Sequence, residues 1–349
     1  LNKNPAEREL DMLMSTGEQI SCALVAIAVQ ALGHPAVSFT GMQVGIKTDS
    51  VFTKARIQTI DANRIHKAHE EGKIVIVAGY QGVNELGEIT TLGRGGSDLT
   101  AVALAYSLDA NVCEIYTDVK GIYTTDPRKV SDARKLQVIT FDEMLEMASL
   151  GAQVMQARSI EVARRFNIPL HVRSSFSKEE GTMIVQGNEK VENVAVRGVT
   201  SNKNEAKITI CAVPDKAGIA AKIFTEISKS GVNVDIIVQN VSQINHTDIS
   251  FTVPMSDLAK ALTAARSIAK KINAGDVQFD KNVARVSIVG SGMRSHHGIA
   301  AKMFQALADN KINIEMISTS EISVSCIINH RHTEKAVKAL HDKFELEKG

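Results

Sequence analysis

The most chemically suggestive segment of the sequence is the octet Thr91-Leu92-Gly93-Arg94-Gly95-Gly96-Ser97-Asp98, which lies just before an alanine-rich helical stretch. Its glycines let the backbone turn sharply and approach a ligand closely. The following helix offers unpaired N–H groups to an anion, and Arg94 adds a planar fork suited to a carboxylate or phosphate. Ser97 or Asp98 could instead simply cap the helix, but capping leaves an arginine between glycines unexplained. No Gly-Lys-Ser/Thr ending is present, so this is not a Walker A loop.

A second polar segment, Ile115–Arg128, leaves the end of an apolar strand candidate and mixes Asp, Tyr, Thr and Arg. Such a loop can reach a ribose with a carboxylate, a nucleobase with a tyrosine and a polyphosphate with an arginine. Asp126-Pro127 and Val119–Gly121 are also ordinary turn sequences, so part of the segment has a simpler explanation. Glu18, in the first helical stretch, joins these candidates only if the fold brings it beside Arg94.

These candidates need a scaffold, and the first half of the chain predicts an α/β domain with a parallel or mixed sheet covered by helices. Short runs rich in valine and isoleucine alternate there with helical patterns. The expected strands are Ala36–Phe39, Ile74–Ala78, Val112–Tyr116 and Leu170–Arg173. The expected helices are Leu10–Leu32, Ala62–Glu71, Asp98–Leu108, Phe141–Ser149 and Val154–Phe166. Ligands of such sheets lie beyond the carboxyl ends of the strands, where the loops after Tyr80 and Tyr116 fall.

The pattern changes at Gly181–Glu192, a polar stretch that we interpret as a linker, and an internal repeat follows it. Each copy is predicted to form a strand, a glycine-containing loop, a helix and a second strand. A unit of this size cannot bury its own sheet face, so the two copies should pack together. The matching segments of the two copies are Lys207–Ala212 and Arg285–Gly290, Gly218–Lys222 and Gly298–Lys302, and Val232–Asp235 and Ile312–Glu315.

Composition excludes several classes of function. Forty Lys plus Arg against thirty-nine Asp plus Glu leave a formal charge of +1, and aromatic residues make up 4% of the chain with no Trp. Neither value suits a nucleic-acid-binding protein. The longest uninterrupted apolar runs are too short to span a bilayer, so we expect no membrane segment. We interpret the cysteines as free thiols in a reducing cytoplasm, and the His296-His297 pair lacks partners at metal-ligand spacing. The cysteines are Cys22, Cys113, Cys211 and Cys326.

In order along the chain, several of these motifs resemble those of the aspartate kinases of the amino-acid-kinase family, and the repeat resembles their paired ACT regulatory domains. The motifs are Ser15–Glu18, Thr91–Asp98, Tyr116–Arg128, and Val172–Phe176 followed by Gly181-Thr182. The similarity covers essentially the whole chain and is nearest to monofunctional, ACT-regulated bacterial enzymes. It implies an α/β amino-acid-kinase fold, with a mainly parallel sheet covered by helices, followed by α+β tandem ACT domains of βαββαβ topology. The implied domains are a catalytic domain over 1–186, a linker and first strand of the ACT pair over 187–204, ACT domain 1 over 205–279 and ACT domain 2 over 280–349.

The resemblance implies transfer of the γ-phosphoryl group of ATP, as its Mg²⁺ complex, to the β-carboxylate of L-aspartate. This is the first step towards lysine, threonine, methionine and diaminopimelate. Arg94 would clamp the α-carboxylate of aspartate and Glu18 would hold its ammonium, and no tightly bound cofactor or resident metal is expected. The implied substrate residues are Glu18, Arg94, Gly95, Gly96, Ser97 and Asp98. The implied nucleotide residues are Thr117, Asp118, Tyr123, Thr124, Asp126, Pro127, Arg128 and Gln153, the last where the family often has lysine.

The resemblance also implies that lysine, threonine or both bind as effectors where the ACT domains pair, and that homo- or hetero-oligomers form through these domains. Helix N–H groups suit an effector carboxylate, and Asp215 or Asp235 suits its ammonium. From the residues alone, Asn233 and Asn313 could equally be turn residues and the acids a solvated face. The implied effector residues are Asp215, Gly218, Asn233, Asp235, Gln239, Met293, Asn313 and Ile314.

One departure from the family concerns its opening strand and Lys-x-Gly-Gly loop, a segment that the sequence does not contain. We therefore expect the chain as given to be catalytically impaired and the full-length gene product to be active. Two other functions stay open from the sequence. One is an amino-acid-sensing regulatory fragment or pseudokinase that does not catalyse, and the other is a kinase for a different amino acid.

Overall fold

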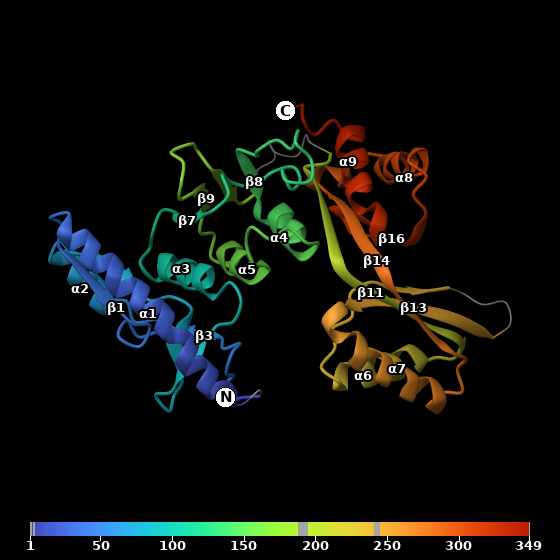
Figure 1. Ribbon diagram of the computed structural model, residues 1–349, viewed down its shortest axis with the longest axis horizontal. Helices are drawn as coiled ribbons and strands as arrows, with labels where there is room; N and C mark the ends of the chain where they lie inside the picture. Colours follow the sequence, from blue (N-terminus) through green and yellow to red (C-terminus); the bar gives the residue numbers. More distant parts are fainter. Residues whose placement is uncertain (1, 3, 188–194, 241–244, 349) are drawn as a thin grey trace. The chain divides into compact units, whose positions relative to one another are not determined.

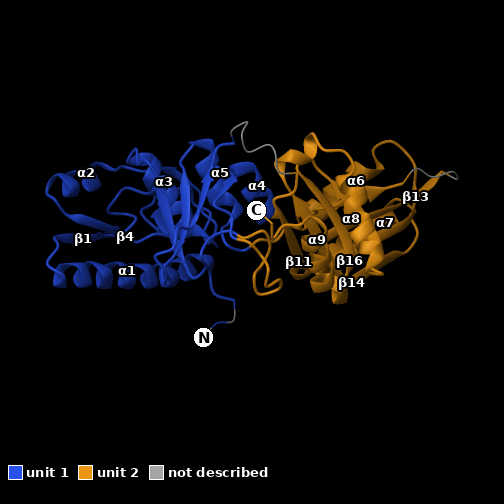
Figure 2. Cartoon of the chain, turned by 90° about the horizontal axis from the view of Figure 1, so that it is seen from above, with its two compact units in different colours: residues 1–122, 135–148, 153–188 blue, residues 123–134, 149–152, 189–349 orange. Residues whose placement is uncertain are grey.

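The computed structural model describes residues 2, 4–187, 195–240 and 245–348. The chain divides into two compact units that interleave along the sequence and are coloured separately in Figure 2. Unit 1 comprises residues 1–122, 135–148 and 153–188, and unit 2 comprises residues 123–134, 149–152 and 189–349. Each unit has its own sheets and hydrophobic core.

Unit 1 is an α/β domain, which confirms the predicted fold class, and its described strands form three small sheets (Figure 1). Its helices are α1 (Glu7–Ala31), α2 (Asn63–Glu70), α3 (Gly96–Ser107), α4 (Phe141–Ser149) and α5 (Ala157–Arg165). The first sheet pairs β1 (Ala36–Phe39) with β4 (Ile74–Val77) in parallel. The second has the order β7 (Cys113–Thr117), β9 (Leu170–Ser174), β10 (Thr182–Val185) and β8 (Val138–Thr140). The third has the order β3 (Ile57–Thr59), β2 (Lys47–Thr48), β5 (Gln81–Val83) and β6 (Ile89–Thr91).

The helices of unit 1 and the strands β1, β4, β7 and β9 lie close to where the hydrophobic pattern predicts them, whereas the pattern does not predict the short strands β2, β3, β5, β6, β8 and β10. β4 consists only of isoleucine and valine, the composition expected of a strand covered on both faces, but here Ile74 is 48% exposed and its other residues are only partly buried. The predicted linker over Gly181–Glu192 is wrong in its first part, because Thr182–Val185 form β10 inside the second sheet. Thr182 and Ile184 of this strand are buried. The polar residues around this short strand concealed it, and residues 188–192 of the predicted linker lie outside the described residues.

Helix α1 packs along β1, β4 and β6. It is also the one helix in the described part of the chain that is long and apolar enough to cross a membrane, with a window of mean hydropathy 1.5 that is 17% buried. The expectation of no such segment considered only uninterrupted apolar runs, and polar residues such as Gln19 interrupt the run here. Length and composition alone are weak grounds for a membrane span.

Unit 2 is built on a six-stranded antiparallel sheet of order β12-β13-β11-β14-β16-β15. The strands are β11 (Gly198–Pro214), β12 (Ile237–Gln239), β13 (His246–Pro254), β14 (Val277–Val289), β15 (Ile314–Thr319) and β16 (Ser323–Asn329). The helices are α6 (Ile219–Lys229), α7 (Leu258–Lys271), α8 (Ile299–Asp309) and α9 (Thr333–Lys343), with 3₁₀ turns at Met255–Asp257, Ser291–Arg294 and His330–His332. The order of elements contains the two predicted strand–helix–strand copies.

The two long central strands belong to both repeats. Glu205–Ile210 of β11 pairs with β13 of the first repeat, whereas Gly198–Asn202 pairs with Arg285–Val289 at the far end of β14. One apolar core joins α6 and α7 to the sheet, and a second joins α8 and α9 to it. A third, smaller cluster brings Ile236 and Met316, which occupy equivalent positions in the two repeats, together with β14 and β16. β11 therefore runs without a break through the predicted boundary between residues 204 and 205.

Candidate functional site

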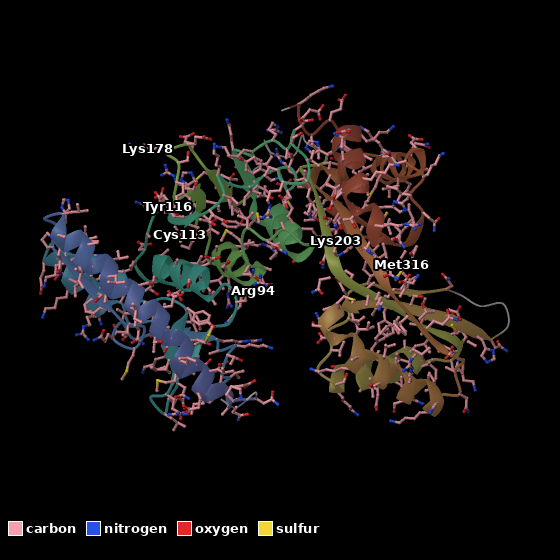
Figure 3. The ribbon with its side chains drawn as sticks, in the orientation of Figure 1. Arg94, Cys113, Tyr116, Lys178, Lys203 and Met316 are labelled. Atoms are coloured by element: carbon pink, nitrogen blue, oxygen red, sulfur yellow. The ribbon has the colours of Figure 1, made fainter. Side chains whose placement is uncertain are left out.

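The glycine-rich octet forms the connection from β6 to α3, with Arg94 on the loop between them (Figure 3). Gly93 and Gly95 both have left-handed backbones, with φ values of 78° and 74°. A Cβ at Gly95 would also lie 2.1 Å from Cγ of Gln156, so a side chain has no room there. The Arg94 side chain is exposed and donates no hydrogen bond to any residue that the structure describes.

The helix that follows the octet begins without a side-chain cap. Gly95 occupies the N-cap position, and no side chain accepts a hydrogen bond there. Ser97 and Asp98 lie within the first turn of α3, so the simple capping explanation for them does not hold. Burial raises the pKa of the Asp98 carboxyl. The first turn of α3 thus adjoins the arginine loop, and the N–H of Gly96 already donates to the carbonyl of Gly93 at 2.9 Å, which leaves the N–H groups of Ser97 and Asp98 as the candidates for an anion.

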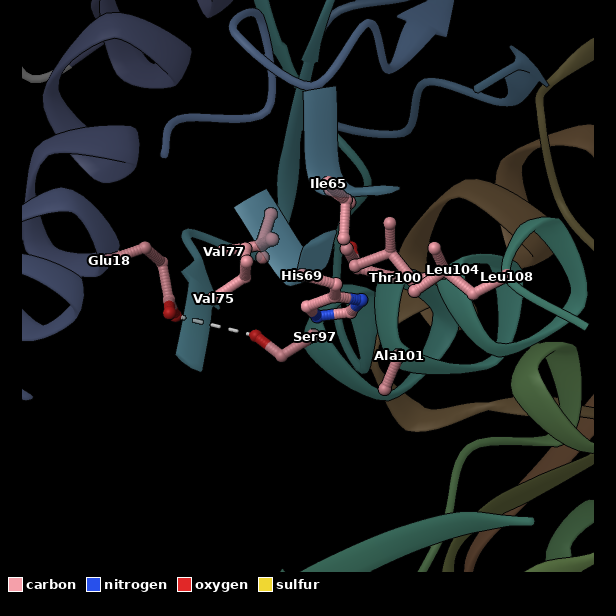
Figure 4. A pocket seen from close by; sticks show the side chains of 11 residues that line it. Glu18, Ile65, His69, Val75, Val77, Ser97, Thr100, Ala101, Leu104 and Leu108 are labelled. Atoms are coloured by element: carbon pink, nitrogen blue, oxygen red, sulfur yellow. Dashed lines mark hydrogen bonds between the residues drawn. The ribbon is translucent and has the colours of Figure 1, made fainter. Parts of the chain in front are cut away.

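The fold brings Glu18 to the octet. Oγ of Ser97 donates a hydrogen bond to Oε1 of Glu18 at 3.4 Å, across 79 residues of sequence. Both side chains line a pocket of about 320 Å³, which is also lined by His69 and by apolar residues of α2, β4 and α3 (Figure 4). The fold therefore brings Glu18 to Ser97 of the octet, three residues along the chain from Arg94, and among the described residues Glu18 and Arg94 are not in direct contact. A carboxylate, a hydroxyl and a helix N-terminus lie together at this edge of unit 1.

The predicted nucleotide residues are divided between the two units. Thr117 ends β7 in unit 1, where its Oγ1 donates to Oδ1 of the exposed Asp118 at 3.1 Å, and the exposed Gln153 also belongs to unit 1. Tyr123, Thr124, Asp126, Pro127 and Arg128 belong to unit 2. Their roles in nucleotide binding stay a prediction.

Asp126 and Arg128 form an ion pair at the surface of unit 2, with Nε of Arg128 3.0 Å from Oδ1 of Asp126. Burial alone would raise the pKa of the Asp126 carboxyl, but the hydrogen bonds and charge of Arg128 together lower it. Pro127, between them, is exposed. The carboxylate of Asp126 and the guanidinium of Arg128 therefore form a charged pair on one short turn.

Thr124 lies inside unit 2 rather than at its surface. Its side chain is buried, its Oγ1 accepts a hydrogen bond from the Arg134 N–H at 3.0 Å, and the same oxygen lies 3.0 Å from Nε2 of His341 on α9. Its carbonyl accepts from the N–H of Val199 on β11. Val130 belongs to the apolar core of the second repeat. The segment 123–134 is thus packed onto the second repeat.

The predicted effector residues occupy equivalent places in the two repeats. Gly218, like its repeat partner Gly298, is the N-cap of a helix and has a left-handed backbone. Asn233 and Asn313 are both exposed at the entry to the second strand. Asp215 is exposed just before α6, Gln239 ends β12, and Met293 and Ile314 pack against the core of the second repeat. No pair of these side chains is shown in direct contact, so their common site stays a prediction.

Asp235 belongs to a set of ion pairs between the two repeats that the sequence did not predict. Arg285, at the start of the second copy, forms an ion pair with Asp235 of the first copy and a second with Glu205, whose Oε1 lies 2.8 Å from Nη2. Lys207, the equivalent of Arg285, forms an ion pair with Glu315, the equivalent of Asp235. Each repeat therefore supplies the cation that binds the acid of the other. An effector ammonium at Asp235 would have to share this carboxylate with Arg285.

Three comparisons with known proteins found matches to this chain. The amino acid kinase family matches residues 2–174, and the ACT domain matches residues 208–267 and 286–344. An aspartate kinase of Stutzerimonas stutzeri (strain A1501) is 53% identical over 348 residues, covering 99% of this chain and 84% of that protein. These matches include both the segment that carries Arg94 and the two repeats.

Solved structures show the same similarity. E. coli aspartokinase III in complex with aspartate and ADP (R-state) has a TM-score of 0.81 at 28% identity, covering 98% of this chain and 77% of that chain. E. coli aspartokinase III in complex with lysine and aspartate (T-state) has a TM-score of 0.76 at 28% identity, with the same coverage.

Proposed function

Because the chain belongs to the aspartate kinases of the amino-acid-kinase family and carries two ACT domains, we propose that it transfers the γ-phosphoryl group of ATP to the β-carboxylate of L-aspartate. The product is 4-phospho-L-aspartate. The observation that carries this proposal is the meeting of Glu18 with Ser97 beside the Arg94 loop. A zwitterionic amino acid needs one cationic group for its carboxylate and one carboxylate for its ammonium. Arg94 supplies the first and Glu18 the second.

In this proposal the residues of unit 1 hold the amino acid. Arg94 binds the α-carboxylate of aspartate through two parallel hydrogen bonds, Glu18 accepts from its ammonium, and the first turn of α3, with Gly95, Gly96, Ser97 and Asp98, completes the pocket. The β-carboxylate that attacks is already ionised near neutral pH, so no protein base is required. Catalysis then consists of positioning and charge neutralisation.

The nucleotide is assigned to the loop after β7. Arg128 suits a polyphosphate, Tyr123 a nucleobase, and Asp118 or Asp126 a ribose or the Mg²⁺ of the ATP complex. Within the described residues no three His, Cys, Asp or Glu side chains cluster as a metal site. Mg²⁺ usually relies on phosphate oxygens, waters and one or two carboxylates, and the exposed Asp118 would supply one such carboxylate.

We further propose that the enzyme serves the route to lysine, threonine, methionine and diaminopimelate, and that lysine, threonine or both inhibit it through the ACT repeats. The T-state relative named above was solved with lysine, which supports lysine as one effector. The packing of segment 123–134 on the second repeat supports the coupling, because a rearrangement of that repeat reaches Asp126 and Arg128 within one unit. Assembly through the ACT repeats, and a cytoplasmic location in which the free cysteines stay reduced, complete the proposal.

The substrate assignment is tested by Arg94→Ala in the full-length enzyme. An arginine–carboxylate hydrogen-bonded pair contributes about 1.5–3 kcal/mol, so we expect KM for aspartate to rise about ten- to a hundredfold while KM for ATP stays nearly unchanged. Arg94→Lys, which keeps the charge and loses the fork, should recover part of the loss. Steady-state kinetics with each substrate varied in turn measures both. Unchanged aspartate kinetics in Arg94→Ala would contradict the assignment.

A further inference from the structure

Asp11 is a buried carboxylate on α1 that neither the sequence motifs nor the proposed function uses. Its exposed fraction is 0%, and each of its oxygens accepts hydrogen bonds from another part of unit 1. The N–H and the Oγ1 of Thr91 donate to it at 2.9 and 2.6 Å, and the N–H of Thr53 donates at 2.9 Å. A buried carboxylate is tolerated only when its acceptors are satisfied in this way. Thr91 is the last residue of β6, and we call Thr91 and Leu92, which lead into the Arg94 loop, its stem. Asp11 therefore binds the stem of the Arg94 loop.

Arg158 on α5 binds the same two backbone segments, 53–55 and 91–92, through their carbonyl groups. Its Nη1 donates to the carbonyl of Leu92 and its Nη2 to the carbonyl of Ala55, both at 2.8 Å. Burial lowers the pKa of this guanidinium. The N–H of Ala55 donates in turn to the carbonyl of Thr91. A carboxylate therefore binds the N–H groups, and a guanidinium the carbonyl groups, of two adjacent segments.

The loop itself is a short turn, closed by a hydrogen bond from the N–H of Gly96 to the carbonyl of Gly93 at 2.9 Å. Arg94 stands in this turn between two glycines with left-handed backbones. The position of the whole turn, and with it the direction of Arg94, therefore depends on the stem on which the turn stands. Glu18 follows Asp11 by seven residues on α1, which is two helical turns and the same face. Asp11 thus links the helix that carries Glu18 to the stem that carries Arg94.

We propose that Asp11 and Arg158 are positioning residues for substrate binding: they fix the stem of the Arg94 loop and, through α1, the spacing between Arg94 and Glu18. The inference rests on the proposed role of Arg94 in binding aspartate. Neither residue needs to touch the substrate. Their effect is to hold the two groups that do, and a displacement of about 1 Å at such groups is enough to cost on the order of a hundredfold in rate.

The test is Asp11→Asn in the full-length enzyme, with Arg158→Lys and Thr91→Val as independent variants that weaken the same hold on the stem. Asparagine keeps the shape of aspartate and loses one acceptor, lysine loses the two-carbonyl fork, and valine removes the 2.6 Å hydroxyl bond. We expect each to raise KM for aspartate, by about tenfold or more for Asp11→Asn, while KM for ATP changes less than about twofold.

The matched control is Cys22→Ala. Cys22 is buried on the same helix and donates a hydrogen bond to the carbonyl of Ile76 at 3.1 Å, away from the loop. It should lower the thermal midpoint and leave both KM values unchanged. If Asp11→Asn, Arg158→Lys and Thr91→Val likewise lower only the thermal midpoint, or raise both KM values equally, the residues are merely structural and the inference is overturned.

A double variant separates this inference from the function on which it rests. If Asp11 acts through Arg94, Asp11→Asn should lose most of its effect on aspartate KM in an Arg94→Ala background. Full additivity of the two effects would overturn the positioning role and leave the role of Arg94 intact. An Arg94→Ala enzyme with unchanged aspartate KM would instead overturn the proposed function itself.

Discussion

At the scale of single residues, His341 shows how unit 2 holds part of the predicted nucleotide loop. Its side chain is fully buried on α9, and its Nε2 lies 3.0 Å from Oγ1 of Thr124. Burial lowers the pKa of this imidazole, and the nearby carboxylates of Glu347, Asp342 and Asp132 only partly offset that effect. The folded protein therefore keeps His341 neutral at a pH at which the unfolded chain is already protonated.

We predict a matching dependence of stability on pH. The unfolded histidine takes up a proton below its ordinary pKa of about 6.5, and the folded one does so only at lower pH. The free energy of unfolding should therefore be fully retained above about pH 6.5 and fall as the pH drops below it, until His341 also protonates in the folded state. His341→Gln should flatten this decline, and thermal unfolding between about pH 5 and 8 measures it.

The control for this prediction is His34→Gln, at an exposed histidine of unit 1. It should leave the pH profile of the wild type unchanged. A profile that His341→Gln alters no more than His34→Gln would show that His341 does not set this dependence.

The sequence predicts the residues proposed to bind substrate better than the buried residues that hold them in place. Arg94 between glycines, and a carboxylate on the first helix, are recognisable because few structural roles need them. Asp11, Arg158 and His341 escaped notice because they bind backbone or buried groups far away in sequence, and nothing local marks such a contact. The clearest signal for Asp11 is its position two helical turns before Glu18, on the same face of the predicted helix.

At the scale of elements, hydrophobic periodicity located β1, β4, β7 and β9 and the helices between them, because long or strongly apolar elements carry their own pattern. It failed at β10, which is four residues long and lies in a polar context. It also gave no sign that β11 and β14 serve both repeats. Strand sharing depends on pairing partners, which a local pattern does not specify.

The ion pairs between the repeats lead to a prediction about β11 and β14. Arg285 and Glu205 both have 4% exposed side chains, so Arg285→Met leaves a buried carboxylate unpaired and should cost about 3–5 kcal/mol of unfolding free energy. Lys207→Met, at a pair that keeps some exposure to solvent, should cost about 1 kcal/mol or less. Chemical denaturation measures both values.

The double variant Arg285→Met/Glu205→Met serves as the check on this explanation. Removing both charges leaves no unpaired buried ion, so it should recover much of the stability lost in Arg285→Met. Burial also raises the pKa of the Glu205 carboxyl, which agrees with a high cost for leaving it without its arginine. A double variant no more stable than the single one would contradict the explanation.

At the scale of the whole molecule, the interleaving of the two units suggests how an effector acts. Residues 123–134 and 149–152 lie in the part of the sequence that the catalytic domain was predicted to occupy, yet they are packed in unit 2. We propose that an effector that favours one packing of the second repeat would act on the turn that carries Asp126 and Arg128. Its differential affinity for the two states sets the size of the effect.

We therefore predict that lysine or threonine binds the full-length enzyme and raises KM for ATP, with a coupling of about 1–3 kcal/mol, or about 5- to 150-fold. Calorimetry measures the binding and steady-state kinetics the coupling. Asn313→Ala should weaken binding, whereas Thr124→Val should leave binding intact and reduce the coupling, because it breaks the link to His341. A Kd of about 1 mM corresponds to a binding free energy of about −4 kcal/mol. If neither amino acid binds at about millimolar concentration, the proposed regulatory site is refuted.

The ion pairs between the repeats, Lys207–Glu315 and Arg285–Asp235, also constrain how the sequence can evolve. Glu205 of the first repeat is a second partner of Arg285, and each repeat contributes one cation and one acid to these pairs between the repeats. That set is self-complementary, so two copies of a single repeat could satisfy it across a two-fold axis, as a symmetric dimer does. Once the copies are fused, neither is free to diverge alone. A reversal of charge at Lys207 is tolerated only with a compensating change at Glu315, 108 residues away, and one at Arg285 only with changes in the first repeat, where Asp235 lies 50 residues away.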